Sequence, residues 1–210
     1  MNFFEILLEG SSDVPAVRSI LQRKFGLREN EDFRVHPHQG RGKLPKHPNL
    51  PPQPKHRGLL DQLPAKLRGY SGLPKGYWLI VLLDADKDKC EMLKQSLVDL
   101  YRALPRKPKR ILFRIAVEET ESWFLADKSA VKKAFPRVDL NRIPGPPHDQ
   151  QSDAWECLAK ALGRSPEECD GGDKLQWAEA ISPHLDLDTP QSPSLSAFIS
   201  GIERCLGQEQ

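Results

Sequence analysis

Short, continuous apolar runs along the chain predict the strands of a sheet. The most apolar run covers residues 78–83, and its length and its β-branched and aromatic content are typical of a buried central strand. Two similar runs cover residues 3–8 and 110–117, and a shorter one covers residues 32–36. The sequence therefore predicts a sheet of about four strands.

Apolar positions at helical spacing predict helices between and after these strands. The first helix follows a Gly-Ser turn, carries Pro15 in its first turn, and ends at Gly26. Further helical patterns cover residues 59–67 (interrupted by Pro64), 87–104, 122–127, 129–135, 153–163, 173–182 and 194–206. Because helices alternate with the strands, we expect an α/β fold with a mostly parallel sheet flanked by helices. Residues 1–135 would form this α/β domain, and residues 136–210 a helical C-terminal extension.

Acidic residues follow three of the four predicted strands: Glu9, then Asp84 and Asp86, then Glu118, Glu119 and Glu121. Parallel strands bring these ends to one edge of the sheet. Carboxylates gathered in one place repel one another unless a cation neutralises them. Mg²⁺ prefers such oxygen ligands, and two such ions can activate water and stabilise the leaving oxygen of a phosphodiester. A D-x-D at a strand end is common in α/β proteins, and Glu118, Glu119 and Glu121 also fit an ordinary helix start. The agreement of three strand ends therefore carries the prediction of a metal site.

A basic segment without predicted secondary structure covers residues 37–57. It holds six prolines and five Lys or Arg residues, and it has no Asp or Glu. A segment of this length inside a compact domain is either functional or disordered. It would bind a nucleic-acid backbone through five cations: Arg41, Lys43, Lys46, Lys55 and Arg57. A solvated insertion remains the alternative interpretation.

The sequence argues against a membrane span and a signal peptide, and its overall charge is uninformative. The net charge of +2 is nearly neutral, and no apolar run reaches the roughly 18 residues of a membrane span. The N-terminal run carries Glu5 and Glu9 and has no basic residues before it, so it is interpreted as a strand and not as a signal peptide. The four cysteines form no C-x-x-C pair, which is typical of reduced thiols in a cytoplasmic protein.

Three motifs resemble those of TOPRIM domains in the variant related to OLD (overcoming lysogenization defect) nucleases. Residues 7–13 read LLEGSSD and resemble the opening motif, and residues 82–86 read LLDAD and resemble the D-x-D motif. Residues 115–127 read IAVEETESWFLAD and resemble a segment of small bacterial TOPRIM-like proteins. Those proteins are often encoded beside ABC-type or AAA ATPases in presumed defence loci. The motifs lie within residues 3–127.

The resemblance assigns roles to six acids of the chain: Glu9, Asp13, Asp84, Asp86, Glu119 and Glu121. It makes Glu9 a metal ligand or general base, and Asp84 and Asp86 the catalytic, metal-binding pair. Asp13 matches the second acid of the opening motif and is a further candidate metal ligand, and one of Glu119 or Glu121 would complete the metal site. Asp13 stands where the motif has a glutamate, so its reach is one methylene shorter. The catalytic lysine of some OLD-like nucleases has no secure match. We interpret Lys174 as an ordinary exposed lysine at a helix start.

The activity implied by the resemblance is a Mg²⁺-dependent phosphodiesterase, with Mn²⁺ as a substitute, that cleaves DNA or RNA. A partner ATPase of the ABC or AAA type and a role in bacterial phage defence are also implied. The alternative is a non-catalytic, TOPRIM-shaped effector or adaptor subunit that works through a protein partner. Its docking surface would be the helices after residue 150.

Overall fold

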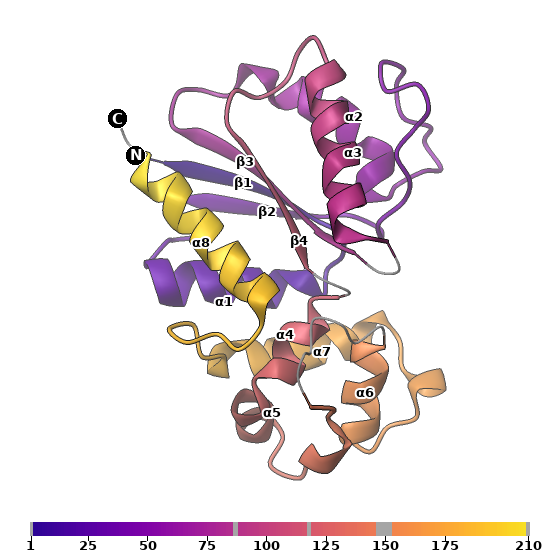
Figure 1. Cartoon of the computed structure of the whole chain (residues 1–210), viewed down its shortest axis with the longest axis vertical. Coiled ribbons are helices and arrows are strands. Elements are labelled where there is room, and N and C mark those ends of the chain that lie inside the picture. The colour runs from indigo at the N-terminus through magenta and orange to yellow at the C-terminus, as the bar shows by residue number, and fades with distance from the viewer. Residues whose placement is uncertain (1, 86–87, 117–118, 146–152, 209–210) are drawn as a thin grey trace.

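A four-stranded parallel sheet lies at the centre of the molecule (Figure 1). The computed structural model describes residues 2–85, 88–116, 119–145 and 153–208. The strands are β1 (Phe3–Leu8), β2 (Phe33–Pro37), β3 (Tyr77–Asp84) and β4 (Ile111–Ala116), in the order β2-β1-β3-β4. All three pairings are parallel, so the carboxyl ends of the strands meet at one edge. The predicted α/β fold with about four strands is confirmed.

Different helices cover the two faces of the sheet. Alternate residues of a strand point to opposite faces, so Ile80 and Leu82 join one hydrophobic cluster and Val81 and Leu83 another. The first cluster includes side chains of α1 (Asp13–Phe25) and α8 (Pro193–Gly207). The second includes side chains of α2 (Leu59–Gly69) and α3 (Cys90–Ala103). The two central strands β1 and β3 are therefore buried on both sides, which explains their continuous apolar runs.

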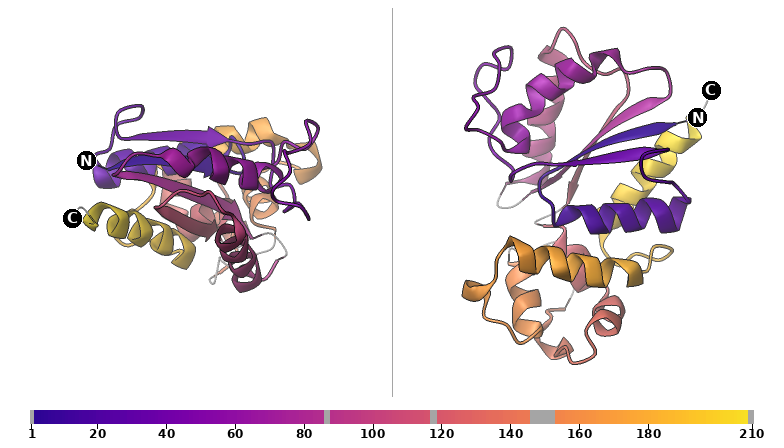
Figure 2. Two further views of the ribbon diagram at one scale, coloured as in Figure 1. Left: turned by 90° about the horizontal axis from the view of Figure 1, so that it is seen from above. Right: turned by 180° about the vertical axis from the view of Figure 1, so that it is seen from behind.

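A lobe of short helices lies beyond the end of β4, at the bottom of Figure 1. Its members are α4 (Glu121–Ala126), α5 (Lys128–Ala134), η2 (Leu140–Arg142), α6 (Ala154–Ala161), η4 (Pro166–Glu168), α7 (Gly171–Ile181) and η5 (Ser182–His184). Helix α1 packs against α7, so one buried cluster continues from the sheet into the lobe. Helix α8 then returns to the sheet and packs on β4 (Figures 1 and 2). None of the helices in the described ranges is long and apolar enough to cross a membrane.

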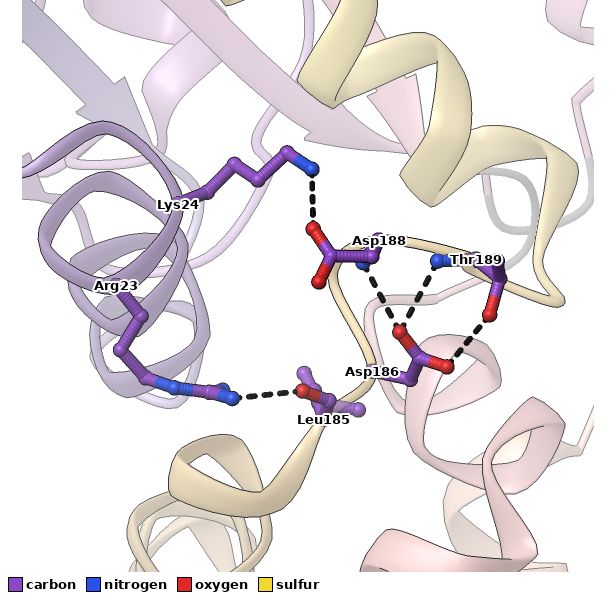
Figure 3. A network of polar contacts seen from close by, with 6 residues as sticks. All are labelled: Arg23, Lys24, Leu185, Asp186, Asp188 and Thr189. Atoms are coloured by element: carbon purple, nitrogen blue, oxygen red, sulfur yellow. Dashed lines mark hydrogen bonds and ion pairs between the residues drawn. The ribbon is translucent and has the colours of Figure 1, made fainter.

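A polar network connects α1 to the loop before α8 (Figure 3). The Lys24 ammonium lies 2.6 Å from Asp188 Oδ1, and the Arg23 guanidinium donates to the Leu185 carbonyl at 2.9 Å. The Asp186 carboxylate accepts from the backbone N–H of Asp188 at 2.9 Å and so fixes the turn of this loop. These contacts help to hold the lobe against the α/β part of the chain.

Two helices differ from their predicted form. Helix α3 begins at Cys90 and not at residue 87; before it, the Asp88 N–H donates to the Ala85 carbonyl at 2.9 Å. Helix α2 continues through Pro64, where the sequence predicts an interruption. Packing of its leucine face on the sheet outweighs the hydrogen bond lost at the proline.

Candidate active site

The pairing of β1 with β3 places two of the predicted acids side by side. Glu9 follows the last residue of β1, and Asp84 is the last residue of β3. The backbone N–H of Asp84 donates to Glu9 Oε2 at 3.3 Å. The parallel register thus brings together residues that are 75 positions apart in the chain.

Asp13 connects the turn after β1 to the segment after β4. Its Oδ2 accepts from the Gly10 N–H at 2.9 Å, and its Oδ1 accepts from the Thr120 hydroxyl at 2.8 Å. Thr120 Oγ1 also lies 3.4 Å from Glu121 Oε2. Asp13, Thr120 and Glu121 are all buried. Both carboxylate oxygens of Asp13 are therefore used to position its neighbours, and Thr120 is a site residue that the sequence interpretation missed.

Lys174 lies against the two glutamates that follow β4. Its Nζ is 3.8 Å from Glu119 Oε1 and 3.9 Å from Glu121 Oε1, and it lies over the Trp155 ring at 4.6 Å from the centroid. Glu119 Oε2 also accepts from the backbone N–H of Trp155 at 3.3 Å. The Lys174 side chain is 25% exposed, so its interpretation as an ordinary exposed lysine is wrong.

The start of α7 explains how Lys174 reaches the acids. The Asp170 side chain accepts from the backbone N–H groups of Gly172 and Asp173 and caps the helix. Lys174 then falls in the first turn, on the side that meets the lobe helices α4 and α6. The sequence signals the helix start, but no local pattern shows that this turn lies beside Glu119, because that contact depends on how the lobe folds.

Burial and mutual repulsion raise the pKa values of the clustered acids. Burial raises the pKa of Asp84 well above its usual value, and the charges of Asp13, Glu9 and Glu121 add to the effect. Burial and the charge of Glu121 raise the pKa of Glu119 to about 7, although Lys174 acts in the opposite direction. Burial also raises the pKa values of Glu121 and Asp13, again against the effect of Lys174. Lys174 therefore only partly neutralises the cluster.

The acids at this edge match the ligand chemistry of a hard divalent cation. Within the described ranges, no group of three His, Cys, Asp or Glu side chains forms a ready-made metal centre. Mg²⁺ usually needs only one or two carboxylates, with waters and substrate phosphate as its other ligands. Glu9 and Asp84 are neighbours at this edge, where the Glu9 carboxylate accepts from the Asp84 backbone N–H. Asp86, which was predicted as a ligand, and Glu118 lie outside the described residues.

The five predicted nucleic-acid-binding cations fall into two groups. Arg41 is half-buried; its guanidinium contacts the Asp88 carboxylate and donates to the Ala85 carbonyl at 3.3 Å. It therefore attaches the basic loop beside the end of β3. The other four cations are exposed: Lys43, Lys46, Lys55 and Arg57.

Comparisons with known proteins agree with this architecture. The C-terminal region of the Xanthomonas campestris pv. campestris OLD protein, phased with iodine, has a TM-score of 0.50 at 16% identity, covering 100% of this chain and 98% of that chain. The same region phased with mercury gives 0.49 at 14% identity over 100% and 98% of the two chains. At 16% identity, the match to the region phased with iodine shows a likeness of fold alone. The curated proteins gave no match.

A family model covers nearly the whole chain. It matches residues 8–203, a range that contains all the acids described above together with Lys174 and the basic loop. The chain therefore belongs to the family described as Domain of unknown function (DUF4276).

Proposed function

We propose that this protein is a Mg²⁺-dependent phosphodiesterase that cleaves DNA or RNA. The observation that carries the proposal is the close approach of Glu9 and Asp84 at the carboxyl edge of the sheet, within a cluster of acids with raised pKa values. Strongly raised pKa values in an acidic cluster are common at functional sites, because folding alone would select against them. Bound Mg²⁺ or Mn²⁺ would supply charge stabilisation and an activated water.

Some residues of the site would bind the metal ion, and others would contact the phosphate of the substrate. Glu9 and Asp84 would hold the ion, together with Asp86. Asp13 and Thr120 would keep the two strand ends in register through their hydrogen bond. Glu119 and Glu121 would orient Lys174, whose ammonium would stabilise negative charge that develops on the phosphoryl oxygens.

The proposal also includes a protein partner, a biological role and a surface that binds the nucleic acid. The resemblance of the three sequence motifs to OLD-related TOPRIM proteins is what suggests an ATPase partner and a role in phage defence. The lobe and α8 would provide surfaces for such a partner. The exposed cations of the basic loop would hold the nucleic-acid backbone near the acids.

Metal-dependent cleavage by the purified protein tests this function. Supercoiled plasmid and structured RNA are incubated with wild type, Asp84→Asn and Asp99→Asn, with Mg²⁺ or with EDTA. Asp99 is an exposed acid on α3 with 60% side-chain exposure and serves as the matched control. We expect Asp84→Asn to lower the rate by about 10²-fold or more, and Asp99→Asn to have no effect.

An equal, metal-independent background for wild type and Asp84→Asn, with and without a partner ATPase, would show that the proposal is wrong. The non-catalytic adaptor would then be the better description.

A further inference from the structure

A cleft of about 450 Å³ lies between the start of the basic loop and the first turns of α3. Its large apolar lining residues are Leu44, Leu60, Met92 and Leu93. Leu60 and Leu93 are buried, whereas Met92 is 66% exposed. The volume falls within the usual range for small-ligand sites, roughly 300–1,000 Å³. An exposed methionine beside a leucine-lined cleft provides a flexible, polarisable surface for a flat ring.

The rim of the cleft is positively charged. Lys43 and Lys89 are exposed at the rim, and the guanidinium of Arg41 contacts the carboxylate of Asp88, which also lines the cleft. Arg41 also donates to the carbonyl of Ala85, the residue after Asp84. The cleft therefore begins beside the acidic edge, and its charge is complementary to a phosphodiester.

The loop that forms one wall of the cleft is held in place at both its neck and its tip. At the neck, the Asp61 carboxylate accepts from the backbone N–H groups of Lys43 and Gly58, each at 3.2 Å. At the tip, the Arg68 guanidinium donates to the carbonyls of Pro48 and Leu50. A ligand that binds here does not need to order the loop, which lowers the entropic cost of binding.

We propose that this cleft binds an unpaired nucleotide of the nucleic-acid substrate. The base would lie on Met92 and the leucines, and the flanking phosphates would meet Lys43 and Lys89. This inference rests on the proposed function and narrows its substrate to single-stranded or locally unpaired nucleic acid. A duplex keeps its bases stacked inside and offers mainly its backbone, so it would gain nothing from the apolar surface.

Binding without turnover tests the cleft separately from catalysis. A fluorescent single-stranded oligonucleotide is titrated with the full chain in EDTA, and a duplex of the same length is the second probe. We expect Met92→Ala to weaken single-strand binding roughly fivefold and to leave duplex binding unchanged. Leu50→Ala is the matched control, because Leu50 is another exposed large apolar residue, at 62%, and lies outside this cleft.

The two lysines are tested through the salt dependence of binding. For single strands, each phosphate contact contributes about 0.7 to the slope of log K against log salt. The double variant Lys43→Ala/Lys89→Ala should reduce this slope by about 1.4, whereas Lys109→Ala, which lies before β4 at the opposite edge of the sheet, should not change it.

The outcomes separate this inference from the proposed function. Asp84→Asn should keep wild-type binding in EDTA while it loses cleavage. Unchanged single-strand affinity in Met92→Ala together with an unchanged salt slope in the lysine variant would overturn the cleft assignment. A wild-type preference for duplex over single strand would overturn it as well. Neither result depends on whether Mg²⁺-dependent cleavage is observed.

Discussion

The acidic edge and the basic loop meet at the end of β3, but their charged side chains differ in solvent exposure. The acids are enclosed: Asp13 and Glu121 are each 4% exposed. The basic loop instead presents Lys43, Lys46, Lys55 and Arg57 to solvent. The two regions join where Arg41 of the loop contacts Asp88 and Ala85, just after Asp84.

This difference in exposure shows which of the two regions lowers the stability of the fold. Exposed cations cost little, because water solvates them. Enclosed carboxylates beside one another are costly, and the raised pKa values of Asp84 and Glu119 express that cost. A group of side chains that destabilises the fold is expected to be kept for a function. The exposed cations of the basic loop do not destabilise the fold, so their presence alone does not indicate a function.

Removal of a carboxylate from the acidic edge, and of the α2 carboxylate that holds the neck of the basic loop, should change stability in opposite directions. At about pH 8 without metal, Asp84→Asn should raise the free energy of unfolding, because it removes a buried carboxyl whose ionisation is disfavoured by burial and by its acidic neighbours. Asp61→Asn should lower it by about 1 kcal/mol, because the backbone N–H groups of Lys43 and Gly58 bond to different oxygens of Asp61, and the amide NH₂ that replaces one oxygen cannot accept. Urea denaturation measures both. A loss of stability in Asp84→Asn would remove the contrast between the two regions.

The neck of the loop should not tolerate a side chain at Gly58. A Cβ there would lie 2.5 Å from the backbone of Gly42, so Gly58→Ala should cost about 2 kcal/mol and expose the loop to proteases. Gly69→Ala is the control, because a Cβ at Gly69 has no atom within 4 Å. Limited proteolysis and urea denaturation test this pair. Equal protease resistance in both variants would mean that the neck contacts do not order the loop.

Lys174 should stabilise the metal-free protein by offsetting the charges of Glu119 and Glu121. Lys174→Ala should lower the free energy of unfolding by about 1–2 kcal/mol at neutral pH, because two enclosed carboxylates lose their cation. Lys133→Ala, on the exposed face of α5, is the matched control and should have little effect. If both lysines can be removed at the same cost, Lys174 does not act on the acids.

The pKa of Glu119 makes the metal-free protein less stable as the pH rises. Its folded-state pKa of about 7 lies above its ordinary value of 4.5, so the folded state holds a proton that the unfolded chain releases. Stability is therefore lost as the pH rises through about 7, and between about pH 6.5 and 8 the loss should be roughly 1 kcal/mol. Burial lowers the pKa of His38 from 6.5, so its opposite contribution is confined to lower pH.

Urea denaturation in EDTA at the two ends of this pH window measures the Glu119 effect. The variant Glu119→Gln should flatten the profile, and saturating Mg²⁺ should raise stability more at the higher pH. A wild-type stability that rises with pH across the window would contradict the assignment.

The sequence predicts the sheet and the position of the acids well, because both depend on short-range patterns. Residues 78–83 and 3–8 are continuous apolar runs, and the parallel order follows from the alternation of strands and helices. Glu9 directly follows the run 3–8, and Asp84 directly follows the run 78–83, so their approach at one edge could be anticipated.

Contacts made by the lobe and by α8 could not be predicted in the same way. Lys174 meets Glu119 across 55 positions of the chain, and Arg114 of β4 donates to the Ala197 carbonyl of α8 at 2.9 Å. Gly201 leaves room for that arginine, since a Cβ there would lie 2.5 Å from it. Such pairings depend on how whole elements pack, and neither hydrophobic spacing nor capping signals encode which elements meet.

Metal binding by the acidic edge tests the central claim most directly. Calorimetric titration with Mn²⁺ at about pH 8, where more of the clustered carboxyls are ionised, compares wild type, Asp84→Asn and Asp99→Asn. We expect saturable Mn²⁺ binding by wild type and Asp99→Asn, and loss of that binding in Asp84→Asn. No binding by wild type, or the same isotherm for wild type and Asp84→Asn, would contradict a metal site built on Glu9 and Asp84.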